Sequence, residues 1–225
     1  MDETMNISQH PHPLLYARAF ISEWPAPLGE DYELTHVRSY FGDQTFDFQP
    51  PPDIKSIIRN LLRVGGFSPS GRNKPACEYL TKAIEKGWFS KETGINAAVD
   101  CCNAVSLHSQ LPISVIDIRK TAPPYTIKIC PEDTSYIFNP SGQILRADGL
   151  LALWDQEEPC GTSVKDSQRS KTDEQTIKTL SIVWGHKEIK EFTDVVTEQY
   201  LALQRMIQFN NVAVRNEEIT ISIMS

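Results

Sequence analysis

Three consecutive prolines at positions 50–52 divide the sequence into two sections of different character. Proline lacks a backbone N–H and cannot pair in the interior of a sheet, so a new element has to begin after this run. Before it, residues 14–21 are apolar in the manner of a strand. After it, isoleucine and leucine recur at spacings of three and four over residues 54–62, which predicts an amphipathic helix. The chain therefore combines strands with helices.

The rest of the chain continues this mixture. Apolar periods predict helices at 74–86, 93–108 and 187–209, and strands at 113–118, 126–130, 144–154, 177–184 and 219–223. Residues 155–176 are almost entirely polar, so we expect a long surface loop there. No internal repeat occurs, and 225 residues with 40% hydrophobic side chains can bury a sizeable core. We expect a single domain, residues 1–225, with the acidic section 1–51 and the helix 187–209 packed on its core.

The charges are distributed unevenly along the chain. The formal net charge of −7 excludes the general basic surface of a DNA-binding or membrane-binding protein. Residues 1–51 include eight acidic residues against two arginines, whereas residues 52–91 include eight lysines and arginines against three acidic residues. In that basic section, Arg72 and Lys74 follow a turn rich in glycine and serine, where an RNA backbone can bind. The alternative is an ordinary connection between two helices.

The sequence has no feature that indicates a membrane segment, a disulfide framework or a metal site. No uncharged apolar run approaches the ~18–20 residues that span a bilayer, and the N-terminus lacks the basic and apolar regions of a secretory signal. The five cysteines form no CxxC pair, and the five histidines have no metal-binding spacing. We expect a cytoplasmic protein with reduced thiols, no metal and no other cofactor.

The predicted helix 93–108 has two stripes of side chains. One stripe is apolar, and the other contains Asn96, Asp100 and Asn103 at spacings of four and three. Asparagine and aspartate are poor helix formers, so three of them within a helix cost about 1–2 kcal/mol relative to alanine. Recognition of a ligand would justify this cost. The alternative is a solvated helix face.

The region at the end of this helix and after it contains the residue types of a serine–histidine–aspartate hydrolytic site. Ser106, His108 and Ser114 lie near Asp117 in the sequence, but no GxSxG motif surrounds a serine. Moreover, Ser114 and Asp117 lie on opposite faces of a regular strand. The sequence therefore assigns no catalytic residue.

Several segments together resemble a known family. The sequences GRNKPA at 71–76, INAAVDCCN at 95–103 and LPISVID at 111–117 are similar to the tRNA-editing module of the phenylalanyl-tRNA synthetase beta chain, and residues 166–176 resemble the loop before a strand in that family. The resemblance implies an α+β fold with a β-sandwich-like core and flanking helices in three layers. It also implies a pocket for an amino acid wrongly attached to the 3′ end of tRNA.

The resemblance further implies which side chains meet the ligand and which partner they meet. Substrate-binding residues would be Asn96, Asp100, Asn103, Ser106, Ser114, Gly161 and Thr162. Of these, Gly161 would let the backbone approach a ligand closely. The RNA-binding residues would be Arg72 and Lys74, and the partner would be tRNA or aminoacyl-tRNA.

Two departures from the family pattern affect this expectation. Ser114 stands where the family has a histidine, and residues 180–184 contain no acid where the family has a glutamate. Neither tyrosine specificity nor hydrolysis therefore transfers directly. In addition, 225 residues hold no ATP-binding catalytic core, so the chain alone is not expected to ligate tRNA.

Three hypotheses about function follow. The leading one is a protein that binds tRNA or aminoacyl-tRNA, with hydrolysis of mischarged tRNA in trans as an open possibility. The second is a module that binds an amino acid or another small molecule and no RNA, which the acidic total charge favours. The third is an interaction protein that uses the helix 187–209 to form a homodimer or to bind another partner.

Overall fold

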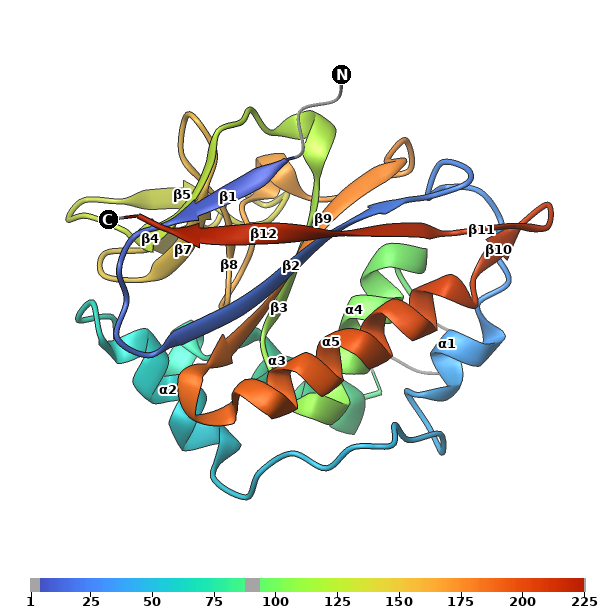
Figure 1. Ribbon diagram of the computed structural model, residues 1–225, viewed down its shortest axis with the longest axis horizontal. Coiled ribbons are helices and arrows are strands. Elements are labelled where there is room, and N and C mark those ends of the chain that lie inside the picture. Colours follow the sequence, from blue (N-terminus) through green and yellow to red (C-terminus); the bar gives the residue numbers. More distant parts are fainter. Residues whose placement is uncertain (1–4, 88–93, 225) are drawn as a thin grey trace.

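The computed structural model describes residues 5–87 and 94–224, and Figure 1 shows their arrangement. The main sheet has the strand order β3-β9-β2-β12-β1-β4-β7-β8. Its strands are β1 Asn6–Gln9, β2 Leu15–Glu23, β3 Ile113–Asp117, β4 Tyr125–Ile129, β7 Leu151–Trp154, β8 Pro159–Thr162, β9 Lys178–His186 and β12 Arg215–Ile223. Two small hairpins are β5 Ser135–Ile137 with β6 Ile144–Arg146, and β10 Gln208–Phe209 with β11 Val212–Ala213. The α-helices are α1 Thr35–Ser39, α2 Ile54–Arg63, α3 Ala76–Glu85, α4 Ala97–Ser109 and α5 Lys190–Arg205.

The main sheet is mixed and nearly closed. β1 runs parallel to both of its neighbours, β12 and β4, and the other neighbouring strands are antiparallel. The two edge strands approach each other, because the Ser114 hydroxyl on β3 donates a hydrogen bond of 3.0 Å to the Thr162 carbonyl on β8. The fold is therefore a mixed α/β arrangement. The two faces expected of a sandwich belong to one curled sheet.

The curled sheet has an apolar core on each of its faces. On β2, Phe20 packs in the core shared with the helices, while Ala19 and Ile21 pack in the core that the sheet encloses. β9 alternates in the same way, with Val183 in the first core and Trp184 in the second. This division follows from the period of two in a strand.

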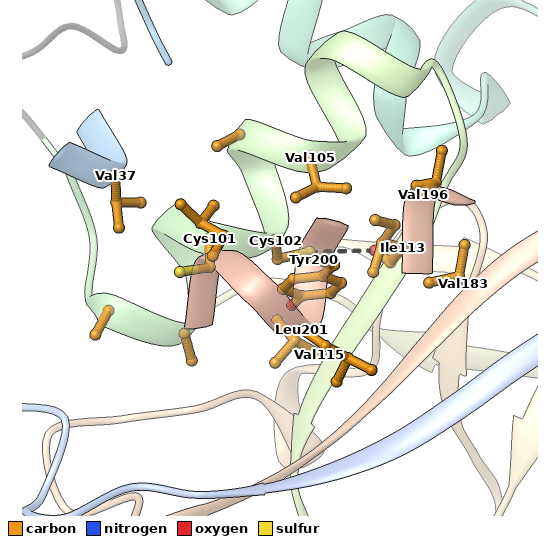
Figure 2. Packing of buried hydrophobic residues seen from close by; sticks show 14 of the residues in the cluster. Val37, Cys101, Cys102, Val105, Ile113, Val115, Val183, Val196, Tyr200 and Leu201 are labelled. Atoms are coloured by element: carbon orange, nitrogen blue, oxygen red, sulfur yellow. Dashed lines mark hydrogen bonds between the residues drawn. The ribbon is translucent and has the colours of Figure 1, made fainter. Parts of the chain in front are cut away.

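Helices α4 and α5 cover the outer face of β2, β9 and β3 (Figure 1). Figure 2 shows Tyr200 of α5 lying between α4 and β3. The Cys102 thiol of α4 donates a hydrogen bond of 3.6 Å to the Ile113 carbonyl of β3. Within the described ranges, no helix is long and apolar enough to cross a membrane.

Helix α2 joins the separate cores. Ile58 belongs to the core under the helices, Leu61 to the core inside the sheet, and Leu62 to a third cluster beside the β5–β6 hairpin. The predicted period of three and four therefore places three neighbouring apolar side chains in three cores. The prediction of a helix over residues 54–62 is confirmed.

Residues 155–176 are not the surface loop that their polarity predicts. They include strand β8, and Ser163, Ser170 and Thr176 are fully buried. Asp155 accepts two hydrogen bonds of 2.8 and 2.9 Å from the Arg169 guanidinium. Because most polar groups of this segment bond within the protein, the segment closes the sheet without a large apolar contribution.

Other predicted elements form with shifted bounds. The run 144–154 divides into β6 and β7 around Gly149, whose φ of +71° favours glycine. Helix α3 begins at Ala76, because residues 71–73 form a 3₁₀ turn and Lys74 is extended. Helix α4 begins at Ala97, and position 93 of the prediction lies outside the described residues. The strands predicted at 113–118, 126–130, 177–184 and 219–223 are confirmed.

Helix α5 is shorter than predicted, and the apolar side chains in the predicted range are not all buried. Val195 and Met206 are 45% and 60% exposed, whereas Thr193, Thr197 and Gln204 are buried. Both threonine hydroxyls donate to carbonyls one turn earlier in the chain. These internal bonds let polar side chains occupy helix positions in the core.

Candidate functional site

The polar stripe of α4 separates into side chains with different roles. Asn96 caps the helix: its Oδ1 accepts the Val99 amide at 3.0 Å, and its Nδ2 donates to the Thr172 hydroxyl at 3.2 Å. Asp100 is fully buried. Asn103 is half-buried, and its side chain forms no hydrogen bond with any described residue. The three side chains therefore do not bind one common partner.

Asp100 organises the entry to α4. Its Oδ1 accepts the Ile95 amide at 2.8 Å, and its Oδ2 accepts Arg38 Nε of α1 at 2.9 Å. A side chain at Gly94 would place Cβ only 2.1 Å from Asp100 Oδ2 and 2.5 Å from Arg38 Nε. Sequence reasoning missed Arg38, which lies 62 positions from Asp100. The only signal for it was its rarity as a basic residue in the acidic section.

A hollow of about 430 Å³ lies at the N-terminal end of α4. Asn96 and Arg38 contribute polar groups to its wall. The rest of the lining is Leu28, Gly29, Glu30, Asp31, Tyr32, Leu34, Ile95, Ala97, Thr172, Asp173 and Glu174. Four of these lining residues are acidic, so the hollow suits a ligand with a cationic or hydrogen-bond-donating group.

Ser114, Gly161 and Thr162 come together where β3 approaches β8. The Ser114 hydroxyl donates to the Thr162 carbonyl and accepts a hydrogen bond of 2.9 Å from the Trp184 indole. A Cβ on Gly161 would lie 3.5 Å from Ser114 Oγ, which is an ordinary contact distance. The structure therefore gives these residues a common place, the seam between the edge strands.

Asp166 adds a titratable group to this seam. Its Oδ1 accepts the Thr162 amide at 2.8 Å. Burial raises the pKa of Asp166 to about 6, although the hydrogen bond from the Thr162 amide favours the ionised form. Sequence reasoning included this aspartate only as part of the loop 166–176 and did not select it.

Ser106 lies apart from both groups. Its hydroxyl donates to the Leu111 carbonyl at 2.6 Å, where the chain leaves α4. His108 Nε2 lies 2.7 Å from the Tyr40 carbonyl. Asp117 instead accepts a hydrogen bond of 2.7 Å from the Thr176 hydroxyl. The structure therefore does not assemble a serine–histidine–aspartate nucleophile from these residues.

A basic cavity of about 370 Å³ lies between α2 and α3. Lys55, Lys74 and Lys82 line it together with Glu78 and Glu85. The pKa of Lys74 is lowered, first by its side-chain interaction with Lys82 and then by the positive charge of Lys82, so the two ammonium groups lie close together. Lys55 and Lys82 were not selected from the sequence, although both belong to its basic section.

Arg72 lies beside this cavity in the chain but does not line it. The arginine side chain is exposed, and its carbonyl accepts a hydrogen bond of 3.2 Å from Lys165 Nζ. The structure therefore separates the two predicted RNA-binding residues: Lys74 faces the cavity, and Arg72 lies on the neighbouring surface.

The cysteines are buried thiols. All five are free, and burial raises the pKa of each, to about 12 for Cys77 and Cys130. Over residues 5–87 and 94–224, no group of three or more histidine, cysteine, aspartate or glutamate side chains is arranged to hold a metal ion.

Comparisons with known proteins identify distant likenesses among solved structures and none among family profiles or curated proteins. No protein-family profile matches the sequence, and no curated protein matches it. Among solved structures, the chain is similar to the crystal structure of an N-terminal fragment of the phenylalanyl-tRNA synthetase beta subunit from Pyrococcus horikoshii. The likeness covers 98% of this chain at 12% identity with a TM-score of 0.48. The chain spans about half, 52%, of that fragment. The likeness is distant.

Within this chain the selected residues occupy different places. Asn96 lies at the hollow beside α4, while Ser114, Gly161 and Thr162 lie at the seam. Lys74 lies at the basic cavity between α2 and α3. Neither the hollow nor the basic cavity is lined by all of them, so each place has to be judged by its own chemistry.

Proposed function

We propose that this protein binds RNA, with tRNA or aminoacyl-tRNA as the expected partner, through the surface of α2 and α3. One observation carries the proposal: Lys55, Lys74 and Lys82 converge on one cavity in a chain whose net charge is −7. Charges more than about 8 Å apart are largely screened at physiological salt, so a local basic group can attract phosphate despite an acidic total.

The charge balance inside the cavity supports the same proposal. Glu78 lies 3.7 Å from Lys55, and both of its oxygens already accept hydrogen bonds of 2.7 and 2.8 Å from Arg59. Lys74 and Lys82 form no ion pair within the described part of the chain. Their charges are therefore available to a phosphate backbone.

Binding of tRNA at several salt concentrations tests this proposal. Arg72→Ala combined with Lys74→Ala should weaken the affinity and reduce the salt slope by about one for each lost phosphate contact. Lys190→Ala on α5 is the control, because Lys190 is exposed and outside the basic cavity. An unchanged slope would show that Arg72 and Lys74 do not contact phosphate. The absence of binding at low salt would contradict RNA binding itself.

Hydrolysis of mischarged tRNA is a separate part of the proposal. The hollow with Asn96 and Arg38 has room for an amino acid and offers hydrogen-bonding groups from two elements. A deacylation assay over a panel of mischarged tRNAs measures this activity. If none of them is hydrolysed faster than it decays spontaneously, the proposed hydrolytic activity is contradicted, but the proposal of RNA binding is not.

The same hollow favours a second candidate function, the binding of a free amino acid or another small molecule. Its volume of about 430 Å³ lies within the usual range of ligand pockets. Thermal shift measurements with an amino-acid library, beside gel shifts with tRNA, separate the two candidates. Stabilisation by an amino acid without retardation of tRNA would favour the small-molecule function.

A further inference from the structure

The cavity between α2 and α3 has more positive charge than its own acids neutralise. Lys55 Nζ lies 3.7 Å from Glu78 Oε2, the same carboxylate that binds Arg59. Glu85 also lines the cavity but forms no ion pair there with a described lysine. The cavity is therefore short of negative charge.

Lys74 and Lys82 both line the cavity, and neither forms an ion pair with a described residue. Lys74 lies just before α3 and Lys82 lies within it, and both side chains line the same cavity. The side-chain interaction with Lys82, followed by repulsion between the two positive charges, lowers the pKa of Lys74 from its ordinary value. A ligand with two negative charges on one group would remove this repulsion more fully than a ligand with one.

This difference distinguishes two kinds of phosphate. A phosphodiester within an RNA chain has one negative charge, whereas a phosphate monoester has about −1.5 to −2 charges at pH 7 and a second pKa of about 6. Two adjacent ammonium groups, with Lys55 as a third, suit the monoester. The excess positive charge lies on the lysines that line the cavity, so the phosphate of the ligand has to enter the cavity to contact them.

The size and the walls of the cavity indicate what accompanies the phosphate. Its volume is about 370 Å³, near the lower end of the range for small-molecule pockets and larger than a phosphate ion needs. Ile58, Pro75 and Cys77 supply apolar lining next to the lysines. Burial raises the pKa of the Cys77 thiol to about 12, so this wall stays uncharged. An apolar wall beside a cationic one fits the base and the phosphate of a nucleotide.

We infer that this cavity binds the terminal phosphate monoester of a nucleotide, with Lys55, Lys74 and Lys82 as the phosphate-binding residues. The phosphate would belong either to the end of an RNA strand or to a free mononucleotide. For the RNA end, the inference rests on the proposed function. For the free nucleotide, the inference does not depend on the proposed function.

Matched ligands test the inference. One single-stranded RNA oligonucleotide is prepared with a 5′-phosphate, with a 3′-phosphate and with hydroxyl groups at both ends, and the affinities of the three forms are compared. The affinity for AMP is compared with the affinity for adenosine. We expect at least one phosphorylated ligand to bind about tenfold tighter than its unphosphorylated match, the effect of one charge-assisted hydrogen bond. Lys74→Gln with Lys82→Gln should remove the preference, and Lys190→Gln should retain it.

The pH dependence gives a second readout. Between pH 7.5 and pH 5.0 the phosphate monoester gains a proton while lysines stay charged, so the phosphate preference should fall several-fold. The affinity of the hydroxyl-ended oligonucleotide should change less. Thermal unfolding shows whether each variant is folded. If the double variant is not folded, the comparison of phosphorylated and unphosphorylated ligands with the wild-type protein still tests the inference.

The outcomes separate the inference from the proposed function. Equal binding of phosphorylated and unphosphorylated ligands overturns the inference, even if RNA binds. A preference that survives Lys74→Gln with Lys82→Gln overturns the assignment of the residues. Binding of AMP without binding of any RNA supports the inference and contradicts the proposed function.

Discussion

Asp166 is a carboxyl group at the seam where β3 and β8 approach without pairing. Its folded pKa of about 6 lies above the ordinary value near 3.9. Because the pKa is higher in the folded protein, the protonated carboxyl contributes stability. This contribution is fully present below the unfolded pKa and is lost as the pH rises through 6. The ionised carboxylate is therefore a destabilising group at neutral pH.

Asp166→Asn should relieve this cost, since an asparagine Oδ1 can still accept the Thr162 amide. At pH 7.5 we expect the free energy of unfolding to increase by about 1–3 kcal/mol, and at pH 4 the variant and wild type should differ little. Urea unfolding at the two pH values measures both quantities. A less stable variant at pH 7.5 would contradict the prediction.

His12 has the opposite pH dependence. It is 6% exposed, and its Nδ1 accepts the Leu15 amide at 3.0 Å. Burial, followed by the charges of Lys187 and His186, lowers the pKa of His12 to about 4. The stability from its neutral ring is present above pH 6.5 and is lost as the pH falls through 4.

His12→Asn should therefore reduce the loss of stability between pH 7 and pH 4.5, by about 1–3 kcal/mol. Asparagine retains an acceptor for the Leu15 amide and does not titrate. Urea unfolding across this pH range provides the comparison, and His10→Asn at an exposed position is the control. The same pH profile in His12→Asn and wild type would show that another group dominates.

At the scale of an element, the N-terminal end of α4 depends on Asp100. Asp100→Asn keeps an acceptor for the Ile95 amide but removes the charge that binds Arg38. We expect a loss of about 2–4 kcal/mol in unfolding free energy, because a buried charge-assisted hydrogen bond is broken.

Asn103→Ala on the same helix is the matched control for Asp100→Asn. The Asn103 side chain forms no hydrogen bond with a described residue, so the change should stay within about 0.7 kcal/mol, the helix propensity gain. Chemical denaturation of both variants tests the contrast. Equal losses would mean that the polar stripe acts as a unit.

At the scale of the whole molecule, the buried cysteines report on global unfolding. Cys77, Cys101, Cys102, Cys130 and Cys160 are all buried within the fold. We expect a thiol reagent to modify few of the five in the native protein at pH 8 and all five in denaturant, because buried neutral thiols are poor nucleophiles. Fast modification of several cysteines under native conditions would indicate local opening.

The fold was predictable where apolar side chains dominate and less so where polar ones do. Ile54, Ile57 and Leu61 repeat with the period of a helix, and α2 forms there. The period does not identify buried polar residues, however. Thr193 and Ser170 are buried because each donates to a backbone carbonyl, and such bonds depend on the surrounding fold.

The sequence alone predicts the mixture of strands and helices, the position of most elements and the concentration of basic residues in 52–91. These depend on side chains that are neighbours along the chain. Only the tertiary structure decided that Asp100 binds Arg38 and that Ser114 meets Thr162, which is 48 positions away. It also brought Lys55 of α2 to the same cavity as Lys74 and Lys82. Such sites depend on contacts between segments that are far apart in the sequence, and the spacing of apolar residues along the chain does not predict these contacts.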